Sequence, residues 1–262
     1  MPLPGISGKA ITYETAAWEI GWSEEQYEKM LPHSRQCIEQ LDADKAGSTT
    51  EFIRKVCGFL SDPIYDNVYV PGLSLDDHDP LYWRAYDTLT HAGAVKPDDV
   101  KVLLNHSDED VRGLGVLVAC GRGDVQSGLR LMLADTSPLV RALAAQGASE
   151  QGASPLPAEM SKAAKDPSPL VRRTLAGGLS RADPLDAGAT KILSVLLKDP
   201  EIQVRAEAVF SAAALLQDMP LRQEVRRKQL FGDAGDYRGI VDRSAADLLR
   251  RLSAPQHLPA PK

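Results

Sequence analysis

The middle of the chain repeats itself at a spacing of about thirty residues. Four segments align on a Val-Arg pair, and successive arginines are 29, 31 and 33 positions apart. The pairs are Val111-Arg112, Val140-Arg141, Val171-Arg172 and Val204-Arg205. A short apolar run and a polar turn precede each pair, and a second periodic run follows it. A unit of this kind is a helix–turn–helix too thin to bury its apolar face alone, so neighbouring units must stack.

The turns carry helix-start signals. In Ser137-Pro138 and Ser168-Pro169 a capping hydroxyl precedes proline, which is tolerated at the first helical position because that N–H has no partner; Asp199-Pro200 offers the same pairing. The second helices place apolar and small residues at helical spacing. These residues are Val140, Leu143, Ala144 and Gly147 in one unit, and Val204, Ala208, Ser211, Ala212 and Leu215 in another. The pattern predicts closely packed helices with small residues where backbones approach.

These segments resemble the HEAT-repeat family of α-solenoids. The resemblance rests on the D-x-x-P-x-V-R turns at 135–141 and 166–172, and on a small residue three positions after the arginine (Gly115, Ala144 and Ala208). Leu175 departs from the second feature, and His106 stands where other turns have aspartate. The resemblance implies an all-α fold, a right-handed α-solenoid of stacked helix–turn–helix repeats. It implies no single function, because such solenoids serve as scaffolds, inhibitors, adaptors and a few enzymes.

The repeat pattern divides the chain into three parts. Clear copies cover about 97–217. A degenerate copy begins at Asp79-Pro80 with Trp83-Arg84 in place of Val-Arg, and another ends at Leu252. We therefore assign 71–252 to the repeats. Residues 1–70 do not fit the repeat and predict an N-terminal helical cap, since exposed solenoid ends are apolar. Residues 253–262 are proline-rich and predict a flexible tail.

Charge and composition exclude several classes of protein. Residues 1–96 contain 8 Lys+Arg and 15 Asp+Glu, while residues 97–262 contain 22 and 21, so the negative charge lies in the N-terminal third. This balance disfavours nucleic acid as a partner. No apolar run is long enough to cross a membrane. Without a secretory signal, and with three isolated cysteines (Cys37, Cys57 and Cys120), the sequence predicts a cytoplasmic protein.

The row of arginines has two interpretations. One is a positive strip for phosphate groups. The other is a structural ladder in which each arginine pairs with aspartates and carbonyls of adjacent turns. The recurrence of the same arginine in every unit favours the ladder, as a stacking requirement would predict. Arg173, one position after a ladder arginine, is expected to be freer to face a partner.

An acidic, aromatic segment comes directly before the clear repeats. Its aromatic side chains would supply buried contact area and its carboxylates would steer a basic partner. We predict that it binds another protein. The partner-binding candidates are Asp76, Asp77, Asp79, Tyr82, Trp83, Tyr86 and Asp87, together with Arg173. The run from Asp76 to Asp79 lacks the glycine and distal glutamate of a calcium loop, so a solvated acidic loop is favoured over a metal site.

Trp83 and Asp87 also support a second hypothesis. They are four residues apart, so both lie on one helical face, and Asp87 occupies the place of the small residues in other repeats. The pair resembles that of HEAT-like DNA glycosylases, which use Trp and Asp to hold and hydrolyse an alkylated nucleotide. Against this, such an enzyme needs a basic groove, and this third is acidic. Alternatively, Asp87 pairs with Arg84 or Arg112.

No motif for catalysis or for a cofactor is found. The histidines have no H-E-x-x-H spacing, no nucleophile elbow is present, and Gly-Arg-Gly-Asp at 121–124 is not followed by the residues of a phosphate loop. We therefore predict a non-catalytic protein-binding module that needs no cofactor and no metal. An inhibitor or immunity protein and an adaptor within an assembly remain equally open, as does the oligomeric state. The DNA glycosylase is the alternative.

Overall fold

The computed structural model describes most of the chain after residue 48. The described residues are 36–37, 39–40, 49–61, 80–91, 95–150, 159–183, 186–231 and 233–253. They form twelve α-helices and one 3₁₀ helix, and no strand is found among them. The all-α prediction is therefore confirmed for these residues. Within them, no helix is long and apolar enough to cross a membrane. The predicted tail from residue 254 on lies outside the described residues. The start of the predicted N-terminal cap and the end of that cap at residue 70 also lie outside them.

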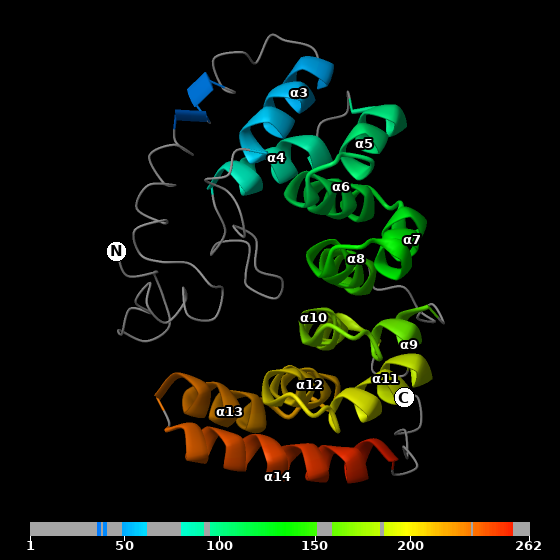
Figure 1. Ribbon diagram of the computed structural model, residues 1–262. Helices are drawn as coiled ribbons and strands as arrows, with labels where there is room; N and C mark the ends of the chain where they lie inside the picture. Colours follow the sequence, from blue (N-terminus) through cyan, green and yellow to red (C-terminus); the bar gives the residue numbers. More distant parts are fainter. Residues whose placement is uncertain are drawn as a thin grey trace, which may run out of the picture. The chain divides into compact units, whose positions relative to one another are not determined.

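The chain divides into two compact units, residues 1–124 and 125–262. This division falls inside the range 71–252 that the repeat pattern treats as one region. The helices described in the first unit are α3 (Thr49–Leu60), α4 (Pro80–His91), α5 (Pro97–Leu104) and α6 (Glu109–Gly121). In this unit α6 packs against α3, α4 and α5 (Figure 1). A helix does begin at Pro80, where the degenerate copy of the repeat is predicted.

The second unit holds the remaining helices in two rows. They are α7 (Val125–Ala134), α8 (Pro138–Glu150), α9 (Met160–Ala163), α10 (Pro169–Gly178), η3 (Leu179–Arg181), α11 (Ala187–Leu196), α12 (Ile202–Leu215), α13 (Met219–Phe231) and α14 (Ala234–Ser253). Helices α8, α10 and α12 pack on one another in chain order, and α14 follows α12. Figure 1 shows α7, α9 and α11 as the second row. Helix α13 packs against both α12 and α14.

The helix starts match the predicted turns only in part. The Ser137 hydroxyl accepts the N–H of Leu139 at 3.2 Å, as a capping residue does. Ser168 stands at the same position of α10, but its side chain makes no capping bond. The predicted start at Asp199-Pro200 is wrong. Helix α12 begins at Ile202, because the Asp199 carboxylate instead accepts the N–H of Glu201 at 3.0 Å and holds both residues in the turn.

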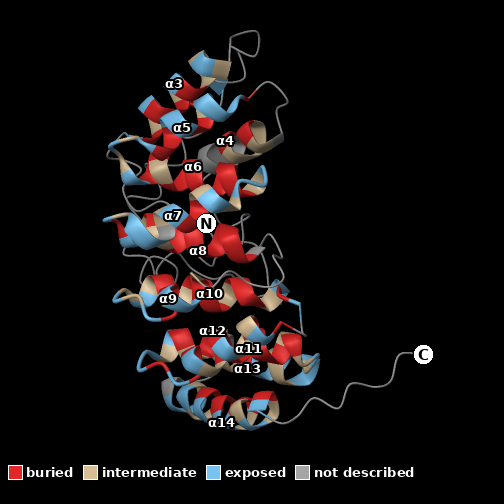
Figure 2. Cartoon of the chain, turned by 90° about the vertical axis from the view of Figure 1, so that its right-hand side faces the viewer, coloured by how far each residue is buried: buried red, intermediate tan, exposed pale blue. Residues whose placement is uncertain are grey.

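The second helix of each unit is buried where the periodicity places its apolar stripe. Val140, Leu143 and Ala144 of α8 have no exposed surface, and the predicted stripe of α12 is likewise buried. Figure 2 shows buried residues along α8 and α10. Gly115 explains the preference for small residues. A Cβ at this position would lie 2.9 Å from the backbone nitrogen of Leu104, so α5 and α6 approach too closely for any side chain.

Candidate functional site

Most of the predicted acidic and aromatic surface lies beyond what the structure describes. Asp76, Asp77 and Asp79 are outside the described residues. Tyr82 and Trp83 belong to helix α4, but their side chains are not described. Tyr86 and Asp87 are described, and both are half-buried. Because α4 is a continuous helix over 80–91, Trp83 and Asp87 stand one turn apart on the same face, as their spacing predicts.

The C-terminal half of α4 is fixed to α6. A Cβ on Gly121 would lie 2.9 Å from the Tyr86 hydroxyl, so this tyrosine reaches over the glycine at the end of α6. The Arg122 guanidinium donates to the carbonyls of Leu89 (3.2 Å), Thr90 (3.1 Å) and Val95 (2.9 Å). Its positive charge also compensates the negative end of the α4 dipole. Tyr86 and Asp87 are therefore presented on a helix held in one position.

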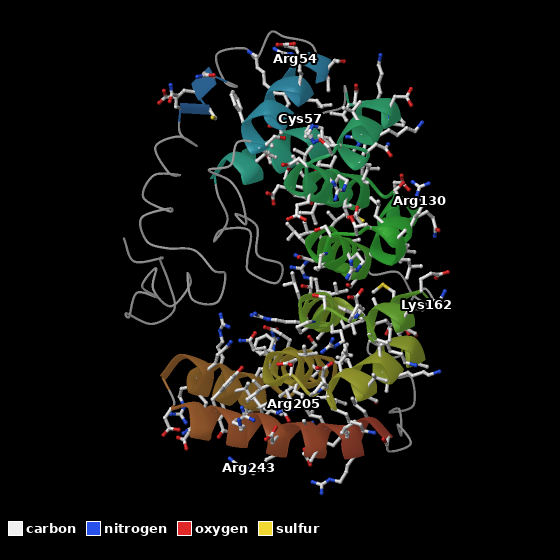
Figure 3. All side chains as sticks on the ribbon, in the orientation of Figure 1. Arg54, Cys57, Arg130, Lys162, Arg205 and Arg243 are labelled. Carbon is white, nitrogen blue, oxygen red and sulfur yellow. The ribbon has the colours of Figure 1, made fainter. Side chains whose placement is uncertain are left out.

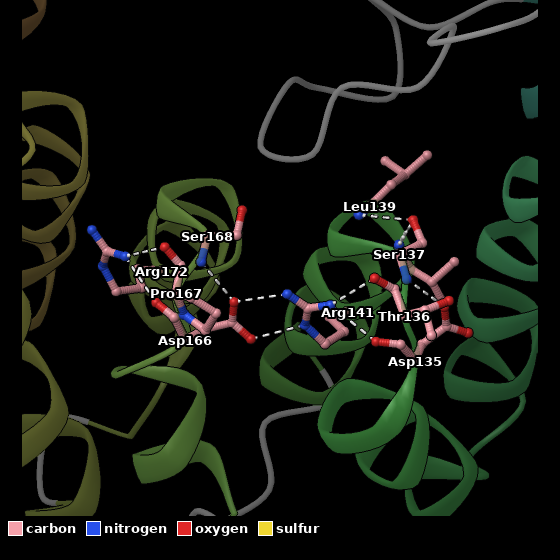
Figure 4. Close-up of polar contacts among 10 residues, drawn as sticks. Asp135, Thr136, Ser137, Leu139, Arg141, Asp166, Pro167, Ser168 and Arg172 are labelled. Atoms are coloured by element: carbon pink, nitrogen blue, oxygen red, sulfur yellow. Dashed lines mark hydrogen bonds and ion pairs between the residues drawn. The ribbon is translucent and has the colours of Figure 1, made fainter.

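The arginine row forms hydrogen bonds within and between turns. Arg141 donates from Nε (2.9 Å) and Nη2 (3.0 Å) to the two carboxylate oxygens of Asp166 in the next turn (Figure 4). Arg172 makes the same pair of bonds to Asp199 at 2.6 and 3.0 Å. Both guanidinium groups are thus bound bidentately, the strongest geometry for an arginine–carboxylate pair. The hydrogen bond to the partner aspartate raises the pKa of Arg141 and of Arg172 above the ordinary arginine value.

Each ladder arginine also closes its own turn. Nη1 of Arg141 donates to the carbonyls of Asp135 (2.9 Å) and Thr136 (3.2 Å) (Figure 4), and Arg112 binds two carbonyls of its own turn in the same way. Arg205, labelled in Figure 3, continues the series at the end of the unit. It pairs with Asp242 of α14 at 2.8 Å. The structural interpretation of the row is confirmed for Arg141 and Arg172, which bind both the carbonyls of their own turn and the aspartate of the next. The side chain of Arg84 lies outside the described residues.

The turn aspartates have a double role that the sequence pattern does not show. Asp166 accepts the N–H of Ser168 at 2.9 Å while it binds Arg141, so one carboxylate shapes its own turn and holds the preceding one. In the first clear repeat His106 takes over the turn-forming part, since its Nδ1 accepts the N–H of Asp108 at 3.2 Å. A neutral imidazole nitrogen suffices for this bond.

Arg173 differs from Arg172 in its acceptors rather than in its exposure. The side chains are 14% and 12% exposed, respectively. Arg172 has four acceptors, whereas the nearest carboxylate oxygen to Arg173 is that of Glu207 on α12 at 3.7 Å, beyond hydrogen-bond distance. Nε of Arg173 is buried and has no hydrogen-bond acceptor among the described residues. The residue after the ladder position is therefore held in place by packing and keeps unused donors.

A second arginine with unused donors lies on the same side of α12, and sequence reasoning missed the arrangement. The Arg222 guanidinium of α13 stacks over the ring of Phe210, 4.2 Å from its centroid. Within the described part of the chain, its buried Nε has no acceptor and its Nη1 has only the Met219 sulfur at 3.8 Å. Glu207 and Phe210 are three residues apart, so Arg173 and Arg222 approach neighbouring positions of one helix face. The basic run at 222–228 is visible in the sequence, but its stacking on Phe210 depends on how α13 packs.

The described residues contain no group of three or more His, Cys, Asp or Glu side chains that would hold a metal ion. The run from Asp76 to Asp79 lies outside them, so the interpretation of that loop stays a prediction. Cys37, Cys57 and Cys120 are buried. Burial raises the pKa of Cys57, which keeps this thiol protonated and poorly nucleophilic.

Comparison with known proteins adds no identification. No protein-family model matches the sequence, and no curated protein matches it.

Proposed function

We propose that this chain is a right-handed α-solenoid of HEAT-like repeats that binds another protein and catalyses no reaction. The observation that carries the proposal is the ladder of Arg141–Asp166 and Arg172–Asp199 pairs. The same bidentate bond recurs between successive turns, while α8, α10 and α12 pack in chain order. Such a scaffold holds its helices in a fixed register and leaves their outer surfaces to a partner.

The proposed contact surface is α4 with the acidic segment before it, defined as Asp76, Asp77, Asp79, Tyr82, Trp83, Tyr86 and Asp87. Two features support it. Bonds from Arg122 fix the end of α4, so the cost of ordering the helix on binding is already met. The segment combines aromatic anchors with carboxylates, which suits a partner that is basic at the contact. An inhibitor or immunity protein and an adaptor would both use such a surface.

The test begins with affinity capture of the tagged full-length chain from its own cells, followed by mass identification. Binding of the purified partner is then measured for Trp83→Ala and for the pair Asp76→Asn and Asp77→Asn. We expect each to raise the Kd at least about tenfold, as loss of an aromatic anchor or of steering charges does. The matched control is the pair Asp98→Asn and Glu109→Gln, which removes two exposed charges of the same unit.

Two results would contradict the proposal. An unchanged Kd both in Trp83→Ala and in the Asp76→Asn, Asp77→Asn pair would exclude this surface. Release of alkylated bases from duplex DNA, lost in Asp87→Asn, would show that the chain is an enzyme of the glycosylase type instead.

A further inference from the structure

The side of the second unit formed by α10, α12 and α13 combines cations and apolar groups. It consists of Arg173, Glu207, Phe210, Met219, Arg222 and Arg226, and is called here the α12 face. Arginine has five N–H donors and no acceptor. On this face Arg173 has one carboxylate oxygen at 3.7 Å, and Arg222 has one sulfur at 3.8 Å. Most donors of both groups therefore have no acceptor among the described residues, in contrast to the ladder arginines.

The two guanidinium groups are nevertheless fixed in position. Nε of each is buried without an acceptor, so packing rather than hydrogen bonding orients the side chain. Stacking on Phe210 holds the plane of Arg222 as well. Donors that are already oriented bind a carboxylate without the entropic cost of ordering a long side chain.

The charge of this part of the unit selects an acidic ligand. Residues 219–231, which form α13, contain four Lys+Arg and one Asp+Glu. Arg226 is exposed and lies one turn after Arg222, so the positive charge continues along one side of α13. The side chain of Met219 is next to Arg222, and the residue is 50% exposed. Arginine, methionine and phenylalanine are residue types that protein interfaces favour.

We infer that the α12 face is a docking site for an acidic segment of a protein partner. Arg173 and Arg222 receive two carboxylates of that segment, and Phe210 with Met219 contacts an apolar side chain beside them. Glu207 occupies part of the site and competes with the ligand for Arg173. The inference shares with the proposed function only the idea that the partner is a protein. It concerns a different surface and a partner of opposite charge.

The probe is a short, fluorescein-labelled, glutamate-rich peptide that carries one leucine, and binding to the full-length chain is measured by fluorescence anisotropy. We expect the pair Arg173→Gln and Arg222→Gln to weaken binding at least about tenfold, because charge-assisted bonds are lost. Arg222→Lys should give a smaller loss, since lysine keeps the charge without the planar fork. Glu207→Gln should strengthen binding several-fold, about the effect of removing a competing charge.

The matched control is the pair Arg243→Gln and Arg250→Gln. Both residues are exposed on α14, so this pair removes the same charge from the same unit and should change the affinity by less than about twofold. Circular dichroism establishes that every variant is folded. Trp83→Ala should bind the peptide as the unchanged chain does, which separates this site from the α4 surface.

Several outcomes would overturn the inference. They are no binding of the acidic peptide, equal loss in the α14 control, weaker binding in Glu207→Gln, or loss in Trp83→Ala. Tight binding of a single-stranded oligonucleotide through Arg173 and Arg222, with no binding of the peptide, would assign the face to nucleic acid instead.

Discussion

The turns that contain Asp135, Asp166 and Asp199, called here the turn edge, lie beside the ladder arginines of the second unit. The turn edge and the α12 face use arginine and glycine in opposite ways. Arg172 and Arg173 are adjacent in α10 and almost equally buried. Among the residues that the structure describes, Arg172 nevertheless has four acceptors and Arg173 has none within hydrogen-bond distance. Gly177 and Gly178 show the same contrast. A Cβ on Gly178 would lie 2.7 Å from Cβ of Ser149 in α8, whereas one on Gly177 would meet only the Glu207 carboxylate at 3.7 Å.

This contrast separates what holds the unit together from what remains open to a ligand. The turn edge is held by the arginine hydrogen bonds and the α8 side of α10 is closely packed, so substitutions there should cost stability. On the α12 face, Arg173 and Arg222 have donors without an acceptor among the described residues. The neighbouring Gly177 has room for a methyl group. Substitutions there should leave stability nearly unchanged and alter binding. The following variants test each side of the comparison.

The largest effect is expected for Arg172→Met, which keeps an unbranched apolar stem and removes the guanidinium. Asp199, 7% exposed, then lacks the cation that its carboxylate binds, and two turn carbonyls lose a donor. Breaking a buried pair from one side costs about 3 kcal/mol or more. Urea unfolding followed by circular dichroism measures the loss. A change below about 1 kcal/mol would mean that the ladder is not a major source of stability.

Gly178→Ala should have the next largest effect. The new methyl group would collide with Oγ and Cβ of Ser149, so α8 and α10 must move apart. Overpacking of this kind costs about 1–3 kcal/mol. Gly177→Ala is the matched control and should stabilise the protein by about 0.5–1 kcal/mol, because alanine is the better helix former. Equal destabilisation by both variants would show that the two sides of α10 are packed alike.

Arg205→Met should cost less than Arg172→Met. The aspartate that Arg205 binds, Asp242, has a side chain that is 50% exposed, so water replaces much of the lost interaction. Two bonds to the carbonyls of Asp199 and Pro200 are also lost. We expect a decrease of about 1 kcal/mol in the free energy of unfolding. A cost equal to that of Arg172→Met would mean that burial of the aspartate does not set the strength of the ladder.

The stabilisation by an arginine–aspartate pair in the turn after α12 should depend on pH. Asp218 accepts from Arg251 at 2.6 Å, and this hydrogen bond holds the pKa of Asp218 below its usual value. A lowered folded-state pKa means that the stabilisation is complete above the unfolded-state value of about 3.9 and disappears as the pH falls through the folded-state value. Asp218→Asn should therefore reduce stability at neutral pH and reduce its fall between about pH 4 and pH 2. Unfolding curves over that range measure the effect, and an unchanged pH profile would contradict it.

The sequence predicts the turn edge because its signal is local and repeated. Arg141, Arg172 and Arg205 recur with a turn acceptor nearby, so their role follows from one unit. The Asp199-Pro200 pair predicts the wrong helix start, because the Asp199 carboxylate accepts an N–H within the turn and the helix begins only at Ile202. The α12 face has no such signal. Phe210 and Arg222 belong to different helices, and their stacking arises only once α13 is packed on α12.

Arg173→Met should show the smallest change in stability and so marks the other limit of the comparison. The methionine replaces the buried part of the side chain, and the guanidinium that is lost has no hydrogen bond and one weak ionic contact. Replacing an incompletely paired buried cation by an apolar residue is often neutral or stabilising, so we expect a change within about 0.5 kcal/mol. The same variant should bind the acidic peptide more weakly. A loss of stability as large as that of Arg172→Met would show instead that Arg173 holds α10 to α12 and is not available to a ligand.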